Sequence, residues 1–352
     1  MLKMEFEVQD KKIGDGHPVF FIAEAGVNHN GSLELACKLI DAALDAGADA
    51  IKFQTFKADK LNTKNAPKSL YHVETTGPDD RQSWYELLKT QELSKEAHLY
   101  LRDYCNSKGI IFLSTPYDEE SADMLDEIGL PLFKLASTDT NNIPFVRYIA
   151  KKGKPIIIST ALCEMDEVQA TVKAVRSEGL ESFVVLQCTG NYPASLDDSH
   201  LRVILTYRKE LRCLVGYSDH VLGPINAIAS TALGSCVYEK HFTIDKLLPG
   251  PDHRMSLEPA ELKETVQAIR LTERALGRPE KRALPSEREN RIKLRKSLVA
   301  ACNITKGALL TREMIEFKRP GTGISPAKLD DFLGKIIKVD IKADSIFQED
   351  MF

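Results

Sequence analysis

Two lysines lie inside apolar segments of this 352-residue chain. Lys52 stands in the run AIKFQ, and Lys134 stands in the run LFKLA. Because a buried ammonium group is costly unless an anion meets it, each lysine requires a negative partner. Hydroxyl side chains end several neighbouring runs, and ammonium and hydroxyl groups together favour a phosphate or a carboxylate ligand. The alternative is an internal ion pair with Glu24 or Glu239.

Two histidines occupy equivalent positions at the ends of two later runs. His220 follows LVGYSD, and His241 ends VYEKH. If these runs are adjacent strands, about 4.8 Å apart, both imidazoles can reach one divalent ion. Two nitrogens are too few for a closed structural zinc site. We therefore expect an open site for Mn2+, with Mg2+ or Co2+ as alternatives. Such an ion would act as a Lewis acid on a carbonyl.

A carboxylate ends the first apolar run. Glu24 stands two residues before Gly26 in the segment EAGVNHNGS, a position that fits a catalytic carboxylate better than a helix cap. Asn30 or Ser32, later in the same segment, is the candidate for the N-cap of the helix that follows.

Eight short apolar runs alternate with helical patterns from about residue 19 to about residue 276. The runs occupy residues 19–25, 50–54, 110–114, 132–136, 155–159, 183–187, 214–218 and 237–241. Their Val, Ile, Leu and Phe content is typical of parallel strands buried on both faces. Eight βα units in roughly 250 residues predict a (β/α)8 TIM barrel, with its chemistry at the C-terminal strand ends. A doubly wound open sheet is the alternative, but no G-x-G-x-x-G follows the first run.

The composition changes after residue 277. We predict a catalytic barrel domain over residues 1–280 and an exposed linker, rich in Pro, Arg, Lys and Glu, over residues 281–296. Residues 297–352 then form a small domain of short strands and turns. Such a module is near the lower limit for independent stability, so we expect it to dock on a larger body such as a second subunit.

The bulk composition excludes several classes of partner. The formal net charge of -4 gives no reason to expect nucleic acid or an acidic membrane. No apolar run reaches the roughly 18 residues of a membrane span, and the charged N-terminus lacks the apolar stretch of a signal peptide. The seven cysteines form no C-x-x-C pair and are expected to be reduced. These features predict a cytoplasmic protein.

The motifs together resemble those of the sialic acid synthase family over essentially the whole chain. They are, in order, FIAEAGVNHNG, KFQTF, FLSTPY, FKLAST, IIIST, QCTGNYP, GYSDH, EKHFT, PGPDH and KRPGTG. Each motif is short, but their order and spacing are highly specific. The resemblance implies a (β/α)8 barrel joined to a small antifreeze-like, or SAF, domain. It also implies a domain-swapped homodimer, in which the small domain of one subunit closes the barrel mouth of the other.

The resemblance assigns roles to the matching positions. Phosphoenolpyruvate would be held by Lys52, Thr115, Lys134, Ser137 and Ser159. The metal and the open-chain sugar aldehyde would be bound by His220 and His241, with Glu24 beside the metal and the activated water. The aminosugar would contact Gln54, Tyr192, Asp252 and, from the second subunit, Arg319.

Three stretches depart from the family pattern. A Gly-Ser-Gly-Glu stretch is replaced by ASTD (136–139), which keeps the acidic group, Asp139, one methylene shorter. Ser-Thr-Gly-Met becomes STAL (159–162). Where bacterial members commonly read His-Cys-Thr-Asn, this chain reads QCTG (187–190), which lacks the Asn that contacts phosphate. The segments DTNNIP and ERALG are more similar to animal-type members, some of which use a 6-phosphorylated sugar.

We therefore predict a transferase that condenses phosphoenolpyruvate with N-acetylmannosamine and water, giving N-acetylneuraminate and phosphate. Glu24 and Asp139 are the candidates for handling the proton of the water, and His241 is the third catalytic candidate. The sugar 6-phosphate and 2,4-diacetamido-2,4,6-trideoxymannose, the precursor of legionaminate, are alternative substrates. A metal-dependent pyruvate aldolase and a non-catalytic binding protein are the alternatives from other classes. The lysine pair disfavours the former, and the converging polar strand ends disfavour the latter.

Overall fold

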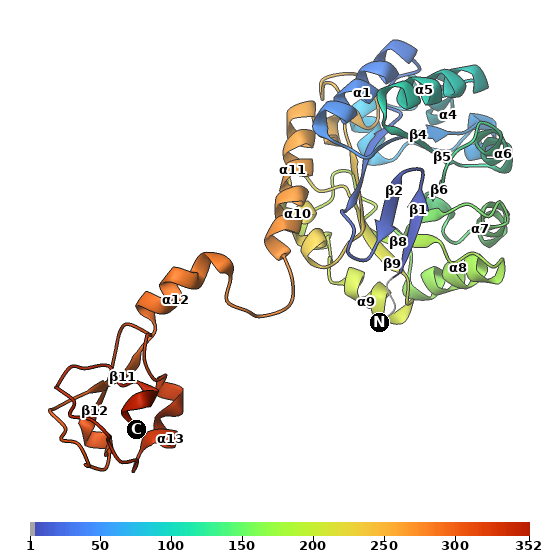
Figure 1. Ribbon diagram of the computed structural model, residues 1–352. Helices are drawn as coiled ribbons and strands as arrows, with labels where there is room; N and C mark the ends of the chain where they lie inside the picture. Colours follow the sequence, from blue (N-terminus) through green and yellow to red (C-terminus); the bar gives the residue numbers. More distant parts are fainter. Residues whose placement is uncertain (1–3) are drawn as a thin grey trace. The chain divides into compact units, whose positions relative to one another are not determined.

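The computed structural model of the chain describes residues 4–352 (Figure 1). The chain separates into two compact units, one ending at Gly277 and the other spanning Arg278–Phe352.

The first unit is a barrel of eight parallel strands. They are β3 (Phe20–Gly26), β4 (Ala50–Thr55), β5 (Ile111–Pro116), β6 (Phe133–Leu135), β7 (Ile156–Ser159), β8 (Phe183–Cys188), β9 (Leu214–Asp219) and β10 (Val237–His241). Hydrogen-bonded neighbours run in the order β5-β4-β3-β10-β9-β8-β7-β6, and β5 also packs against β6. The sheet is thus a nearly closed barrel, which confirms the predicted fold and overturns the open-sheet alternative.

Helices surround the barrel strands (Figure 1). They are α1 (Leu33–Ala46), α5 (Lys95–Lys108), α6 (Glu119–Glu127), α7 (Ile143–Ala150), α8 (Met165–Ser177), α9 (Val203–Glu210), α10 (Ile225–Ala232) and α11 (Pro259–Leu276). Helix α1 is capped at its start by Ser32, whose side chain accepts a hydrogen bond from Leu35 N, and at its end by Gly47, where φ is +84°. Among residues 4–352, no helix is long and apolar enough to cross a membrane.

The connection between β4 and β5 is longer than the other connections between barrel strands. It carries three helices before α5, namely α2 (Ala58–Leu61), α3 (Leu70–Thr76) and α4 (Trp84–Gln91). Helix α4 packs closely against the loop that follows β3. A Cβ atom at Gly31 in that loop would lie only 2.5 Å from the carbonyl oxygen of Thr90 in α4. Gly31 also has φ +74°, so glycine is required there for two reasons.

The side chains inside the barrel change from apolar to polar or charged towards the C-terminal strand ends, as β10 and β4 illustrate. In β10, Val237 belongs to the apolar cluster inside the barrel, whereas Glu239 and His241 follow at spacings of two residues. In β4, Ala50 belongs to the same cluster, and Lys52 comes next on that face. The apolar layer therefore fills the N-terminal half of the barrel, and the polar layer lies at the C-terminal strand ends.

A hairpin that the sequence analysis did not predict packs against the apolar layer. It consists of β1 (Glu5–Val8) and β2 (Lys11–Gly14), and its Val8 and Ile13 join the cluster inside the barrel. These two are the buried apolar side chains of short segments that are rich in Glu and Lys, so the hydrophobic signal there is weak.

The second unit has its own small core. Strands β11 (Ser297–Ala300) and β12 (Ile315–Lys318) pair antiparallel, and α12 (Arg288–Leu294) and α13 (Leu329–Phe332) are its α-helices. Its core is formed by Leu298, Ala300, Ile304, Leu310, Ile315, Ile324, Phe332, Ile337, Ile341 and Phe347. Helix α12 lies within the stretch that the sequence analysis treated as a linker.

Candidate active site

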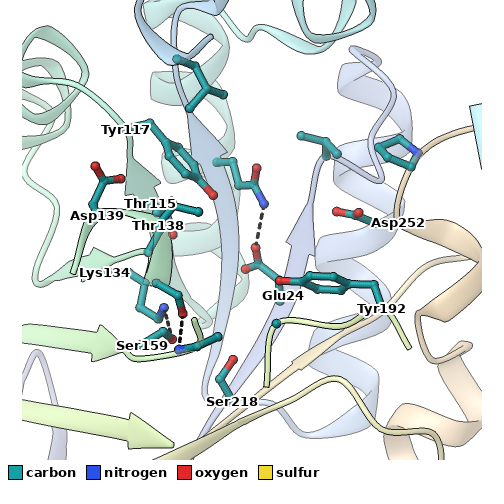
Figure 2. A pocket seen from close by; sticks show the side chains of 18 of the residues that line it. Glu24, Thr115, Tyr117, Lys134, Thr138, Asp139, Ser159, Tyr192, Ser218 and Asp252 are labelled. Carbon is teal, nitrogen blue, oxygen red and sulfur yellow. Dashed lines mark hydrogen bonds between the residues drawn. The ribbon is translucent and has the colours of Figure 1, made fainter. Parts of the chain in front are cut away.

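A cavity of about 600 Å3 opens at the C-terminal ends of the barrel strands, and all eight strands contribute to its lining. It brings together twelve of the predicted site residues: Glu24, Lys52, Gln54, Thr115, Lys134, Ser137, Asp139, Ser159, Tyr192, His220, His241 and Asp252. Figure 2 shows the side chains of Glu24, Lys134 and Asp252 around this space. Arg319 belongs to the second unit, directly after β12.

Two buried lysines and two buried carboxylates form a charged cluster at one wall of the cavity. Lys52 Nζ lies 2.6 Å from Glu24 Oε2 and 3.7 Å from Glu239 Oε2. Lys134 Nζ lies 3.6 Å from Glu239 Oε1. Each of the four residues is at most 5% exposed. Both lysines thus form the internal ion pairs that the sequence left open, and both also line the cavity.

Each of these lysines also donates to a hydroxyl group on the neighbouring strand. Lys52 Nζ donates to Thr115 Oγ1 (2.9 Å), and Lys134 Nζ donates to Ser159 Oγ (2.6 Å). Ser137 Oγ accepts a hydrogen bond from the backbone N–H of Ala161 (2.9 Å), which fixes its position beside β7. The result is a pair of ammonium–hydroxyl units, the kind of group that binds phosphate and carboxylate oxygens.

The two carboxylates of the cluster differ in their protonation. Burial raises the pKa of Glu24 to about 7, although the nearby Lys52 ammonium opposes this shift. Burial would also raise the pKa of Glu239, but the ammonium groups of Lys134 and Lys52 outweigh it and hold this pKa below the usual value. Glu24 can therefore exchange a proton near neutral pH, whereas Glu239 stays ionised and balances the lysines.

Glu239 is a site residue to which the sequence analysis gave no functional role. It appeared there only as a possible ion-pair partner. Its role could have been inferred from the strand VYEKH, because alternate residues of a strand share a face and Glu239 therefore lies on the same face as His241.

Two imidazoles and a phenol ring meet in the same cavity. The ring centroids of His220 and His241 are 5.4 Å apart, and Tyr192 packs on His220 at 4.1 Å. His220 Nδ1 lies 2.7 Å from the Thr189 carbonyl oxygen, so this nitrogen carries the proton and Nε2 keeps its lone pair. His241 Nδ1 is buried without a hydrogen-bond partner.

The histidine pair has the donor chemistry of an open metal site. Burial lowers the pKa of both His220 and His241, so both rings are neutral at pH 7, which is the form that binds metals. Among residues 4–352, no group of three or more His, Cys, Asp and Glu side chains surrounds a common metal position. The unpaired nitrogen of His241 and the oriented ring of His220 fit an ion that takes its other ligands from water and substrate.

Polar groups from β4 and from two loops also line the cavity. Gln54 Nε2 donates to Glu24 Oε1 (3.4 Å). Asp252 Oδ2 lies 3.9 Å from His241 Nδ1, and burial raises the pKa of Asp252 to about 6. Burial also raises the pKa of Asp139, whose Oδ1 accepts from Asn142 Nδ2 (3.2 Å). Two carboxyl groups other than Glu24 can thus exchange protons at this site.

The segment after β4 supplies a further wall that sequence reasoning missed. Asn62, His72, Trp84, Leu88 and Gln91 line the cavity there. The sequence offered one indication of this wall, namely the length of the segment, because residues 56–94 are too many for one ordinary βα loop.

Comparison with known proteins identifies the family. Residues 39–281 match the NeuB family, and residues 295–352 match the SAF domain. The chain is 43% identical to the N,N'-diacetyllegionaminic acid synthase of Legionella pneumophila, over 95% of this chain and 94% of that protein. It is 38% identical to the human N-acetylneuraminate-9-phosphate synthase, over 96% and 94%.

A solved structure agrees with this match. The N-acetylneuraminic acid synthetase of Leptospira borgpetersenii, crystallised with citrate, superposes with a TM-score of 0.74 at 33% identity. The alignment covers 82% of this chain and 95% of that one. The predicted resemblance is confirmed, and the chain belongs to the NeuB family of nonulosonic acid synthases, with a SAF domain at its C-terminal end.

Proposed function

We propose that the protein condenses phosphoenolpyruvate with an N-acylated aminosugar and water to give a nonulosonic acid and inorganic phosphate. The observation that carries this proposal is the pair of ammonium–hydroxyl units, Lys52 with Thr115 and Lys134 with Ser159, which line the same cavity as two neutral histidines. One wall suits the anionic groups of phosphoenolpyruvate, and the other suits a metal and a carbonyl oxygen.

The charged cluster would bind phosphoenolpyruvate and hold it for reaction. Lys52 and Lys134 would neutralise its phosphate and carboxylate, with the hydroxyl groups of Thr115, Ser137 and Ser159 as hydrogen-bond partners. This positioning directs C3 of phosphoenolpyruvate, a carbon nucleophile, towards C1 of the sugar aldehyde and accounts for much of the rate enhancement.

The residues that would hold a divalent ion, with Mn2+ as the first candidate, are His220 and His241. When bound, such an ion supplies Lewis acidity to the sugar aldehyde oxygen. Tyr192 packs on His220 and keeps that ring in place.

The carboxyl groups would handle the protons. As C3 bonds to C1, the π pair of the aldehyde moves to its oxygen and C2 is left cationic. Water adds at C2 and gives up a proton, which balances the proton that the former aldehyde oxygen takes up. Glu24, whose pKa is near neutral, is suited to take that proton, with Asp139 as the second candidate. The resulting tetrahedral carbon then loses phosphate by C–O cleavage, which leaves the 2-keto acid.

The sugar specificity is part of the proposal. N-acetylmannosamine is the first substrate to consider, followed by its 6-phosphate and by 2,4-diacetamido-2,4,6-trideoxymannose. The human relative's name supports the 6-phosphate, and the Legionella relative's name supports the diacetamido sugar. We also propose a domain-swapped homodimer in which Arg319 of a second copy contacts the sugar.

The direct test is phosphate release from phosphoenolpyruvate with Mn2+ and each of the three sugars. Release that requires one of the sugars and is abolished by EDTA supports the proposal. Sugar-dependent consumption of pyruvate without phosphate release would favour the aldolase alternative instead.

A further inference from the structure

A buried glutamine without a partner faces the cavity from helix α4. Gln91 is 2% exposed, lines the cavity, and its Oε1 makes no hydrogen bond. A buried amide that lacks hydrogen bonds is costly, so such groups usually have a partner that completes them. Because Gln91 lines the cavity, a molecule bound there is the candidate partner for its amide.

The surroundings of Gln91 are apolar or neutral. Trp84, Leu88 and Gln91 are spaced by four and three residues, so they lie on one face of α4, and all three line the cavity. The Asn62 amide accepts a hydrogen bond from Trp84 Nε1 (2.6 Å) when its oxygen faces the indole. The His72 ring stacks on Trp84 with centroids 4.2 Å apart and planes 12° apart.

Two lysines lie near this wall: Lys60, whose side chain is exposed, and Lys68, whose Nζ donates to the Gly77 carbonyl oxygen (3.0 Å) and does not line the cavity. Burial lowers the pKa of His72, so its imidazole is neutral at pH 7. The Lys60 side chain also lines this part of the cavity, but its Nζ is paired with Glu120 Oε1 at 3.3 Å. The wall therefore contrasts with the cluster of two lysines and two glutamates at the strand ends.

We propose that Gln91, with Trp84 and Leu88 beside it, binds the second acylamino group of a 6-deoxy diacetamido sugar. The inference rests on the proposed function and names the substrate class of that same site. An amide both donates and accepts, so Gln91 complements the N–H and C=O of an acylamino group. The indole and Leu88 provide apolar surface for its methyl group and for the deoxy carbon of the sugar.

The position of the wall favours the second acylamino group over the first. The group at C2 is one bond from the reacting C1 and must lie near the strand ends, where His220 and His241 are. Helix α4 belongs to the long connection between β4 and β5 and to none of the strands, so we expect it to contact a part of the sugar further from C1. N-acetylmannosamine has no acylamino group there.

Trp84 makes this proposal measurable without turnover, because it is the only tryptophan in the sequence. The experiment is a fluorescence titration of the full-length protein in EDTA. The ligands are N-acetylmannosamine, its 6-phosphate and 2,4-diacetamido-2,4,6-trideoxymannose. Gln91→Met keeps the volume and removes the hydrogen bonds, and Gln169→Met makes the same change at an exposed helical position.

The proposal predicts that the diacetamido sugar binds at least about tenfold more tightly than N-acetylmannosamine. Gln91→Met should reduce this ratio to near one, and Gln169→Met should leave it as in the wild type. Equal affinities in the wild type, tighter binding of the 6-phosphate, or an unchanged ratio in Gln91→Met would overturn it. Phosphate release measured in parallel tests the reaction separately, since a fluorescence response without turnover contradicts only the proposed function.

Discussion

The ammonium nitrogen of Lys52 lies 2.6 Å from Glu24 Oε2, with both side chains buried at the end of adjacent strands. A buried ion pair adds little to stability, because desolvation offsets most of the attraction between the charges. In the proposed reaction, its value lies in keeping a cation at the strand ends, where it can meet an anionic substrate. Because Glu24 has a pKa near 7, it can also accept a proton when the substrate approaches Lys52.

Lys52→Met tests the anion site. The variant keeps the length of the side chain but loses the charge, so the KM for phosphoenolpyruvate should rise by about ten- to one-hundredfold, the worth of a charge-assisted hydrogen bond. The measurement is steady-state kinetics at saturating sugar. Lys57→Met, at an exposed lysine paired with Glu92, is the control. An unchanged KM for phosphoenolpyruvate in Lys52→Met would place the phosphate elsewhere.

His241→Ala tests the metal site. The variant should lose metal-dependent turnover and weaken Mn2+ binding, as followed by calorimetry, while circular dichroism shows an intact fold. His200→Ala, at an exposed histidine, should behave as the wild type. Full activity of His241→Ala with Mn2+ would rule out the proposed metal site.

A buried histidine should make the fold sensitive to mild acid. Burial lowers the pKa of His29 to about 4, so between about pH 6.5 and pH 4 the unfolded chain takes up a proton that the folded chain does not. His29 should therefore cost roughly 3 kcal/mol of stability as the pH falls through this window.

The matched variant for this effect is His29→Asn, whose amide oxygen can still accept from the Gly31 N–H, as His29 Nδ1 does. Buried Glu24 has the opposite slope, because its raised pKa makes the folded state gain protons first. The measurement is therefore the difference in unfolding free energy between the two proteins at pH 7 and pH 4.5. A difference that does not change with pH would show that His29 is not neutral in the folded protein.

Arg319 offers a test of the domain-swapped dimer. Lys134→Met and Arg319→Ala should each be inactive, because each removes one part of every site. If Arg319 acts on the barrel of the other copy, mixed dimers regain one complete site each. Refolding an equal mixture should then restore up to about a quarter of wild-type activity. No recovery from the mixture would contradict the exchange between subunits.

Strong and regular signals made the barrel predictable from the sequence. Eight apolar runs gave the strands, and the polar residues at their ends, such as Lys52 and His241, line one cavity as expected. The role of Glu239 was missed because a carboxylate between two lysines reveals its function only when the strands are closed into a barrel.

The wall formed by α4 was missed for a different reason. Gln91 and Trp84 lie in a connection with no repeated apolar pattern, and their place at the cavity depends on tertiary packing of α4 against the loop after β3. The hairpin of β1 and β2 was missed because only Val8 and Ile13 in it are buried apolar residues. Short elements that depend on the rest of the fold leave little periodicity to read.

The central claim is that phosphoenolpyruvate is joined to the sugar through C3 and loses phosphate by C–O cleavage. The most direct measurement uses phosphoenolpyruvate that carries 18O in the bridging oxygen and 13C at C3, with the sugar that supports phosphate release. We predict that the 18O leaves in the phosphate and that the 13C is found in the nine-carbon 2-keto acid. Retention of 18O in the organic product, or 13C only in pyruvate, would contradict the account.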